Sequence, residues 1–166
     1  GTYARDKDAV DASMTLCEAA AYYKTKNMTL WDAMLAMYER YGYYKDGVKA
    51  VTMKGIEGLE KIQEIMNSLR QNPPAEFAGH KVVAVRDYKA DTIKNLETGE
   101  VTPTGLPNSN VLYYELTNDA WVCVRPSGTE PKVKFYYGVK GTSLADADEK
   151  SAVMGKAVLD MVDSMM

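Results

Sequence analysis

One segment in the C-terminal half of the chain restricts the fold more than any other. Residues 122–137 are V-C-V-R-P-S-G-T-E-P-K-V-K-F-Y-Y, two strand-like runs on either side of a short polar loop. Pro126 and Pro131 exclude helix from this loop and stiffen it, and Gly128 lets its backbone turn. The segment therefore predicts two strands that are joined by a rigid loop.

The loop carries the chemical groups that hold a phosphate. Arg125 offers a planar fork of donors that matches two phosphate oxygens at once. Ser127 and Thr129 each have a hydroxyl hydrogen to donate, and Gly128 allows backbone N–H groups to line an anion-binding concavity. The same residue types also form ordinary hairpin turns, and composition alone favours that alternative.

Length, charge and composition exclude other classes of protein. The 166 residues are 46% hydrophobic and 26% charged, with a formal net charge of -3, as in an ordinary globular domain. The acidic balance argues against nucleic acid as a partner. No apolar run is long enough to span a membrane and no signal-peptide pattern is present, so we expect no membrane partner and a cytoplasmic location.

Cysteine and histidine are too sparse for the common catalytic and metal sites. Cys17 and Cys123 are far apart in apolar surroundings, which predicts two buried free thiols. No C-x-x-C or H-E-x-x-H spacing occurs, so we expect no metal site. His80, the single histidine, has no acidic or nucleophilic motif beside it and is expected to lie on the surface.

The first 41 residues predict a helical hairpin. One helix ends near Lys24, and Thr29, with Asp32 three positions on, caps a second helix that ends near Gly42. Such a hairpin cannot bury both of its faces alone. Apolar residues recur at helical spacing in both helices and predict buried stripes: Val10, Met14, Cys17 and Ala21, then Leu30, Met34, Met37, Tyr38 and Tyr41.

Residues 42–166 predict a separate α+β domain. A strand at 43–53, with a turn near Asp46-Gly47, precedes a helix at 55–71, and the last helix follows Thr142 or Ser143. Residues 97–110 predict a surface loop. Helix 55–71 is expected to bury one apolar face, made of Ile56, Leu59, Ile62, Met66 and Leu69. Strands are expected between this helix and the last one, at 81–88, 92–96, 111–116, 121–125 and 133–139.

This order of elements predicts a two-layer domain of the β-α-β4-α type, TBP-like, with a mostly antiparallel sheet and its helices on one face. The helical hairpin precedes this domain in the chain.

The order of residues in the loop adds a family resemblance. R-P-S-G-T-E-P followed by K-V-K-F-Y resembles the phosphate-binding loop in the C-terminal domain of the α-D-phosphohexomutases, the phosphoglucomutase/phosphomannomutase family. The opening G-T-Y-A-R-D-K-D-A-V-D-A is similar to the segment after the family's sugar-binding G-E-E-S loop, and G-I-E-G-L-E-K-I at 55–62 adds support. The resemblance implies that residues 1–41 end the third of four domains and residues 42–166 form the fourth, phosphate-binding domain.

The resemblance implies roles for particular residues. Arg125, Ser127, Gly128, Thr129 and Lys134 match positions that grip the substrate phosphate distal to the reacting one, although alternation along a strand could point Lys134 away. Lys7 and Glu130 lie outside this set. Lys7 either approaches a bound sugar phosphate or is a solvated lysine in a first helical turn, and Glu130 is expected to turn outward or to pair with Lys132.

The resemblance also implies an activity for the parent protein. In the family a phosphoserine transfers its phosphoryl group to a hexose 1- or 6-phosphate, through a hexose 1,6-bisphosphate, with Mg²⁺ bound. The parent is thus expected to be an intramolecular phosphotransferase of the isomerase class that uses Mg²⁺ and glucose 1,6-bisphosphate. The chain lacks the phosphoserine segment, the metal loop and the sugar loop, so we expect it to be inactive and to have no catalytic or metal-binding residue.

The expected partners are hexose phosphate and the N-terminal domains of the same protein. Two alternatives stay open at this point. A sheet backed by helices also serves as a nucleic-acid-binding module, and Met-rich helices at both ends favour a structural or dimerisation module.

Overall fold

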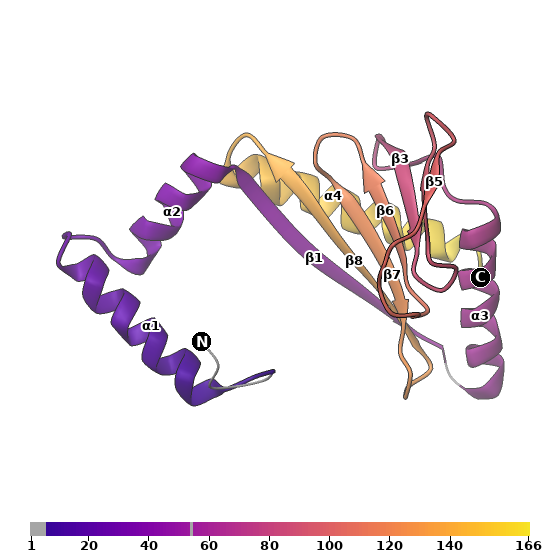
Figure 1. Cartoon of the computed structure of the whole chain (residues 1–166), viewed down its shortest axis with the longest axis horizontal. Coiled ribbons are helices and arrows are strands. Elements are labelled where there is room, and N and C mark those ends of the chain that lie inside the picture. The colour runs from indigo at the N-terminus through magenta and orange to yellow at the C-terminus, as the bar shows by residue number, and fades with distance from the viewer. Residues whose placement is uncertain (1–5, 54) are drawn as a thin grey trace. The chain divides into compact units, whose positions relative to one another are not determined.

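The computed structural model describes residues 6–53 and 55–166, apart from the side chain of Ile56. The chain forms two compact units, Gly1–Gly42 and Tyr43–Met166, and Figure 1 traces both. In the described residues, the first unit forms two helices and no strand, and the second combines an antiparallel sheet with two helices. The predicted α+β class is confirmed.

The first unit contains helices α1 (Ala9–Lys24) and α2 (Leu30–Tyr41). The carboxylate of Asp8 caps α1 by accepting from the backbone N–H groups of Val10 and Asp11, at 2.9 and 3.0 Å. Thr29 and Asp32 form a reciprocal capping box at the start of α2. The predicted helical hairpin is present.

The buried stripe predicted for α1 is wrong in this structure. Val10 and Met14 are 71% and 68% exposed, Cys17 is exposed, and α1 contains no buried residue. In α2, the structure buries Ala33 rather than the apolar stripe. The physical reason is that two helices form one contact line, which leaves the rest of each apolar surface uncovered.

The second unit is built on a sheet with the strand order β1-β8-β7-β6-β3-β4-β5, in which β2 also pairs with β3. All of these pairs are antiparallel. The elements are β1 (Tyr43–Thr52), α3 (Gly55–Gln71), β2 (Glu76–Phe77), β3 (His80–Asp87), β4 (Thr92–Asn95), β5 (Val101–Thr102), β6 (Leu112–Leu116), β7 (Trp121–Pro126), β8 (Lys132–Gly141) and α4 (Leu144–Asp163).

The core lies between one face of this sheet and the two helices, and Figure 1 shows α4 running along the sheet. Alternate residues of β8, among them Val133 and Phe135, are fully buried in a cluster that also includes residues of both helices. The Tyr114 hydroxyl donates to the carbonyl of Leu69 at 3.1 Å, which ties β6 to α3. The opposite face, called the open face below, therefore carries the other alternate side chains.

Several local predictions need correction. Leu59 is 50% exposed, and Ile65 takes the expected place on the buried face of α3. His80 is half-buried rather than free on the surface, with Nδ1 3.0 Å from the carbonyl oxygen of Thr117. Cys123 is half-buried rather than buried. Residues 97–110 are not entirely loop, because they contain β5.

Strand β1 runs without a turn through Asp46-Gly47, contrary to the prediction. Asp46 pairs with Gly138 and Gly47 with Tyr137 in a continuous register with β8. The ring of Tyr137 occupies the space that a side chain at position 47 would fill. Gly47 therefore serves close packing in a strand, which a local pattern cannot distinguish from a turn.

Candidate anion-binding site

The candidate site lies where β7 ends and β8 begins. Arg125 of β7 pairs in register with Lys134 of β8, and Cys123 pairs with Tyr136. Because successive residues of a strand point to opposite faces, the burial of Val124 and the residues around Lys134 places these pairs on the open face. Two cationic side chains thus lie side by side.

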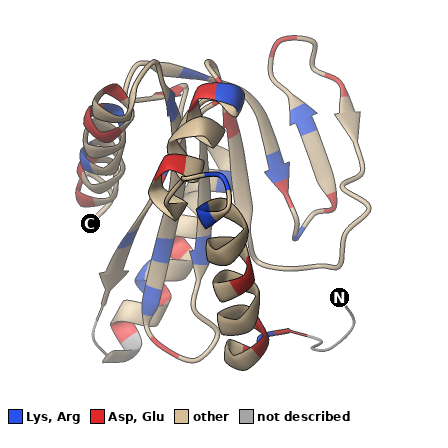
Figure 2. Ribbon diagram, turned by 90° about the vertical axis from the view of Figure 1, so that its left-hand side faces the viewer, with Lys and Arg blue, Asp and Glu red and all other residues tan. Residues whose placement is uncertain are grey.

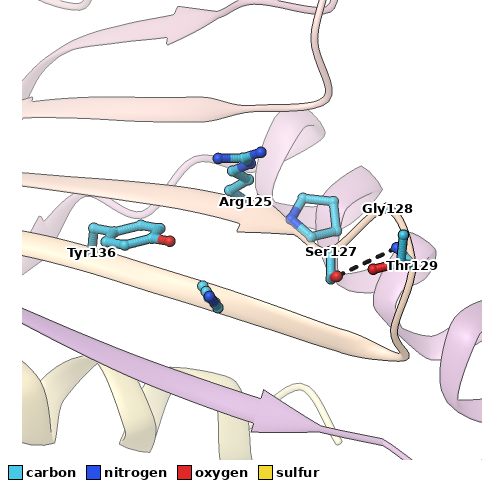
Figure 3. A pocket seen from close by; sticks show the side chains of 7 residues that line it. Arg125, Ser127, Gly128, Thr129 and Tyr136 are labelled. Atoms are coloured by element: carbon cyan, nitrogen blue, oxygen red, sulfur yellow. Dashed lines mark hydrogen bonds between the residues drawn. The ribbon is translucent and has the colours of Figure 1, made fainter. Parts of the chain in front are cut away.

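The loop between the strands is held by its own hydrogen bonds. The Ser127 Oγ accepts from the backbone N–H of Thr129 at 3.4 Å (Figure 3) and from that of Glu130 at 3.3 Å. The Ser127 N–H donates to the carbonyl of Lys132 at 2.7 Å, which closes the base of the loop. The Gly128 N–H makes no hydrogen bond within the part of the chain that the structure describes.

These residues surround a hollow of about 380 Å³. Figure 3 shows Arg125 and Tyr136 on neighbouring strands at one end and the turn of residues 127–129 at the other. All five residues predicted from the loop line the hollow, and two more complete it: Arg125, Ser127, Gly128, Thr129 and Lys134, with Pro126 and Tyr136. The alternative that Lys134 points away is wrong, whereas phosphate binding by these residues stays a prediction.

Glu130 does not line the hollow. Its carboxylate accepts from the Lys132 ammonium at 3.0 Å, and this hydrogen bond lowers the pKa of Glu130. The negative charge is thereby compensated beside the loop, as expected from the sequence. The net charge on the lining is therefore positive.

Lys7 belongs to the first unit. Its ammonium lies 2.9 Å from the carboxylate of Asp6, and both side chains are largely exposed. This geometry is that of a solvated ion pair, which contributes little to stability. A substrate contact at Lys7 stays a prediction.

The predicted site residues omit two that line the hollow: Pro126, for which only a stiffening role was expected, and Tyr136. The signal for Tyr136 was the period of two along a strand, because a residue two positions after Lys134 lies on the same face. The adjacent Tyr137 lies in the core, and the sequence did not show which of the two tyrosines faces the site.

The donors in this hollow suit an anion and not a metal ion. A guanidinium, an ammonium and hydroxyl hydrogens stabilise negative charge, whereas Mg²⁺ requires anionic or carbonyl oxygens. Among the described residues, no three His, Cys, Asp or Glu side chains are grouped so as to hold a metal. None of the described helices is long and apolar enough to cross a membrane.

Charged residues of both signs are interspersed over the helices and strands that Figure 2 shows. The positive charge of the hollow thus belongs to a chain whose formal net charge is -3.

Comparison with known proteins agrees with this description. Residues 48–155 match the family model described as "Phosphoglucomutase/phosphomannomutase, C-terminal domain". The chain belongs to this family, of which it contains the C-terminal domain.

Individual relatives extend the match to the helical unit. The chain is 36% identical over 152 residues to a protein named "Phosphoglucomutase" from Staphylococcus aureus strain bovine RF122 / ET3-1, and 35% identical to that of strain MSSA476. In both cases 92% of the chain is covered, but only 27% of the relative. The chain therefore spans about a quarter of the length of these curated relatives.

A solved structure supports the fold. The chain aligns over 99% of its length, with a TM-score of 0.57, to the open form of the exocytosis-sensitive phosphoprotein pp63/parafusin, a phosphoglucomutase from Paramecium. The identity is 15%, and 28% of that chain is covered.

Proposed function

We propose that the hollow between β7 and β8 binds the phosphate group of a hexose phosphate. The observation that carries this proposal is the convergence of Arg125, Lys134 and the loop hydroxyls on one hollow of the open face. Glu130, the one carboxylate in the loop, is paired with Lys132 outside that hollow. An anion placed there meets positive charge and hydroxyl or backbone donors.

The expected strength suits a reversible clamp. A hydrogen bond to a charged group contributes about 1.5–3 kcal/mol net. Three or four such bonds anchor a phosphate, less the entropy that is lost when the ligand docks. The loop's internal hydrogen bonds at Ser127 reduce that loss, because the turn is already ordered.

In the parent protein, this clamp would hold the phosphate that is not reacting. We propose that the parent interconverts hexose 1-phosphate and hexose 6-phosphate through a phosphoserine and a hexose 1,6-bisphosphate. Residues 1–41 would end its third domain and residues 42–166 would form its fourth. The phosphoserine and the Mg²⁺ site would lie outside this chain, in the cytoplasmic parent's other domains.

Kinetics of the parent test this role. Arg125→Ala removes one or two charge-assisted bonds, so we expect kcat/KM to fall by about 10- to 100-fold. Because a remote clamp acts in the transition state as well, kcat should fall along with affinity. The control is Lys94→Ala, which removes an exposed cation on β4 outside the hollow. Unchanged kinetics in Arg125→Ala contradict the proposed role.

The isolated chain should not turn over substrate. It contains the proposed clamp but no phosphoserine segment, so a coupled assay for hexose phosphate isomerisation should give no rate above buffer. Measurable mutase activity from this chain alone would contradict the proposal.

A further inference from the structure

A second hollow, of about 370 Å³, lies on the open face of the sheet. Leu106, Pro107 and Val111 supply apolar walls, and Tyr88 and Tyr113 supply two aromatic rings. None of these residues lines the anion hollow. The second hollow thus requires its own explanation.

The aromatic wall is held in place by its neighbours. Tyr113 stacks on Trp121 with ring centroids 5.5 Å apart and planes 11° from parallel. The guanidinium of Arg86 lies over the same ring, 5.6 Å from its centroid, and is itself paired with Glu115. The Tyr113 ring is therefore fixed in orientation before any ligand arrives.

The outer wall is a loop that is also ordered. The Asp91 carboxylate accepts from the N–H groups of Thr104 and Gly105, at 3.0 and 3.1 Å. The Asn108 side chain donates to the carbonyl of Lys89 at 2.7 Å. These bonds hold both ends of the segment that presents Leu106 and Pro107. The hollow is open to solvent over much of its rim, and its combination of apolar walls with a few polar groups is typical of small-molecule sites.

The second hollow is adjacent to the anion hollow. Cys123 lines the second hollow, and its cross-strand partner Tyr136 lines the anion hollow. Burial raises the pKa of the Cys123 thiol, and the nearby charge of Arg125 opposes that shift. Cys123 and Arg125 are two residues apart on one strand, about 7 Å along it. The ribose of a nucleotide bridges a separation of this order.

We propose that the second hollow binds the base of a nucleoside monophosphate whose phosphate occupies the anion hollow. This inference rests on the proposed function, because the nucleotide shares the phosphate site. A nucleotide bound in this way competes with hexose phosphate and regulates the clamp.

The chemistry of the walls favours a base over a sugar ring. A base is planar and apolar on both faces, so it packs against the aliphatic side chains, the Tyr88 ring and the part of the Tyr113 ring that Trp121 and Arg86 leave uncovered. Its edge can exchange hydrogen bonds with the hydroxyls of Tyr88, Ser109 and Tyr113, which also line the hollow. A hexose carries hydroxyls around the whole ring, and the apolar residues would leave many of them without partners.

Titration of the chain with three probes tests the inference. Inorganic phosphate, adenosine and adenosine 5'-monophosphate are added separately, and backbone amide shifts report the two hollows. We expect phosphate to shift residues 127–129, adenosine to shift residues 106–111, and the monophosphate to shift both. Burial of the base should make the monophosphate bind at least about tenfold more tightly than phosphate.

A matched pair of variants assigns the base site. Leu106→Ala removes an exposed apolar wall and should weaken binding of the monophosphate several-fold while leaving phosphate affinity unchanged. Leu96→Ala, outside the hollow, should change neither affinity.

Two results overturn the inference: residues 106–111 remain unshifted with the monophosphate, or Leu106→Ala binds it as well as the unchanged chain. Absence of any shift at residues 127–129 with inorganic phosphate would instead contradict the proposed phosphate clamp. The two failures are therefore distinguishable.

Discussion

At the residue scale, Gly128 is a position where a substitution should affect ligand binding but not folding. Its φ lies outside the left-handed region, and a Cβ added there would meet no atom within 4 Å. The fold therefore does not require glycine at this position. The proposed clamp does, because a phosphate oxygen must approach the Gly128 N–H closely.

This difference gives a first prediction. Gly128→Ala should change the free energy of unfolding by no more than about 0.5 kcal/mol. Its phosphate affinity should fall by about tenfold, because the added methyl group hinders the approach of a phosphate oxygen to the N–H of residue 128 and weakens one charge-assisted hydrogen bond. Gly79→Ala is the converse control, because Gly79 has a φ of 78° and lies outside the hollow. This variant should be less stable than the unchanged chain and should bind phosphate equally well. Equal phosphate affinity in Gly128→Ala and the unchanged chain would show that the phosphate does not approach residue 128 closely enough to meet the added methyl group.

Asp146 gives a second prediction at this scale, on pH. Its carboxylate accepts from the Lys150 ammonium at 2.8 Å and from the Thr142 N–H at 2.7 Å. These bonds, that of Lys150 first, lower the pKa of Asp146 from 3.8 to about 2. A lowered carboxyl pKa stabilises the fold above the unfolded value and loses this effect as pH falls through the folded value.

The free energy of unfolding should therefore decrease as pH falls from 3.8 to about 2. In Asp146→Asn this free energy should decrease less steeply over the same pH range. The urea midpoint measured at a series of pH values checks this. Asp163→Asn, at the exposed end of α4, should keep the original slope. An unchanged slope in Asp146→Asn would show that Asp146 does not control this transition.

At the element scale, Arg70 joins the last turn of α3 to the sheet. Its Nε donates to the Asp87 carboxylate at 3.0 Å, and both side chains are only 16% exposed. Its Nη2 donates to the Asn110 side chain, just before β6. One guanidinium thus connects α3, β3 and the segment that leads into β6.

Arg70→Ala should destabilise the second unit by about 2–3 kcal/mol, because the Asp87 carboxylate loses its partner in a poorly solvated place. Denaturant unfolding gives this number. Lys61→Ala, which breaks the exposed pair with Glu64 on the same helix, should cost no more than about 0.5 kcal/mol. Similar losses in the two variants would mean that Arg70 has only a surface role.

The same scale explains what the sequence could predict. The strands that carry Arg125 and Lys134 follow a period of two, and the loop residues form their hydrogen bonds locally, so five of the seven residues that line the hollow were predicted. The continuity of β1 at Gly47 was not, because it depends on the Tyr137 ring from a distant strand. The second hollow was also not predictable, since it joins residues from three separate segments.

At the scale of the whole molecule, the second unit has its own core. The large cluster of buried residues draws its members from residues 62–162, and its partly buried neighbours extend from Val51 to Met165. In the described part of the first unit, Ala33 is the single buried hydrophobic residue. The apolar stripe of α1 was predictable as a pattern, but its exposure was not, because burial depends on what covers the helix.

A protein of residues 43–166 should therefore fold alone. We expect it to unfold in one cooperative transition, with a midpoint close to that of the whole chain, and to bind phosphate equally well. A peptide of residues 1–42 should show no cooperative transition. Loss of cooperative unfolding in residues 43–166 would mean that the helical unit is required for the core.

The central claim is that residues 125–134 form a clamp for the phosphate of a phosphorylated sugar. The most direct test is titration of the isotope-labelled chain with glucose 1,6-bisphosphate while backbone amide signals are recorded. We predict saturable shifts at residues 127–129 that require at least about tenfold more ligand in Arg125→Ala and are absent when an oligonucleotide is added instead. An unchanged dissociation constant in Arg125→Ala, or a bisphosphate titration without shifts at residues 127–129, would contradict the account.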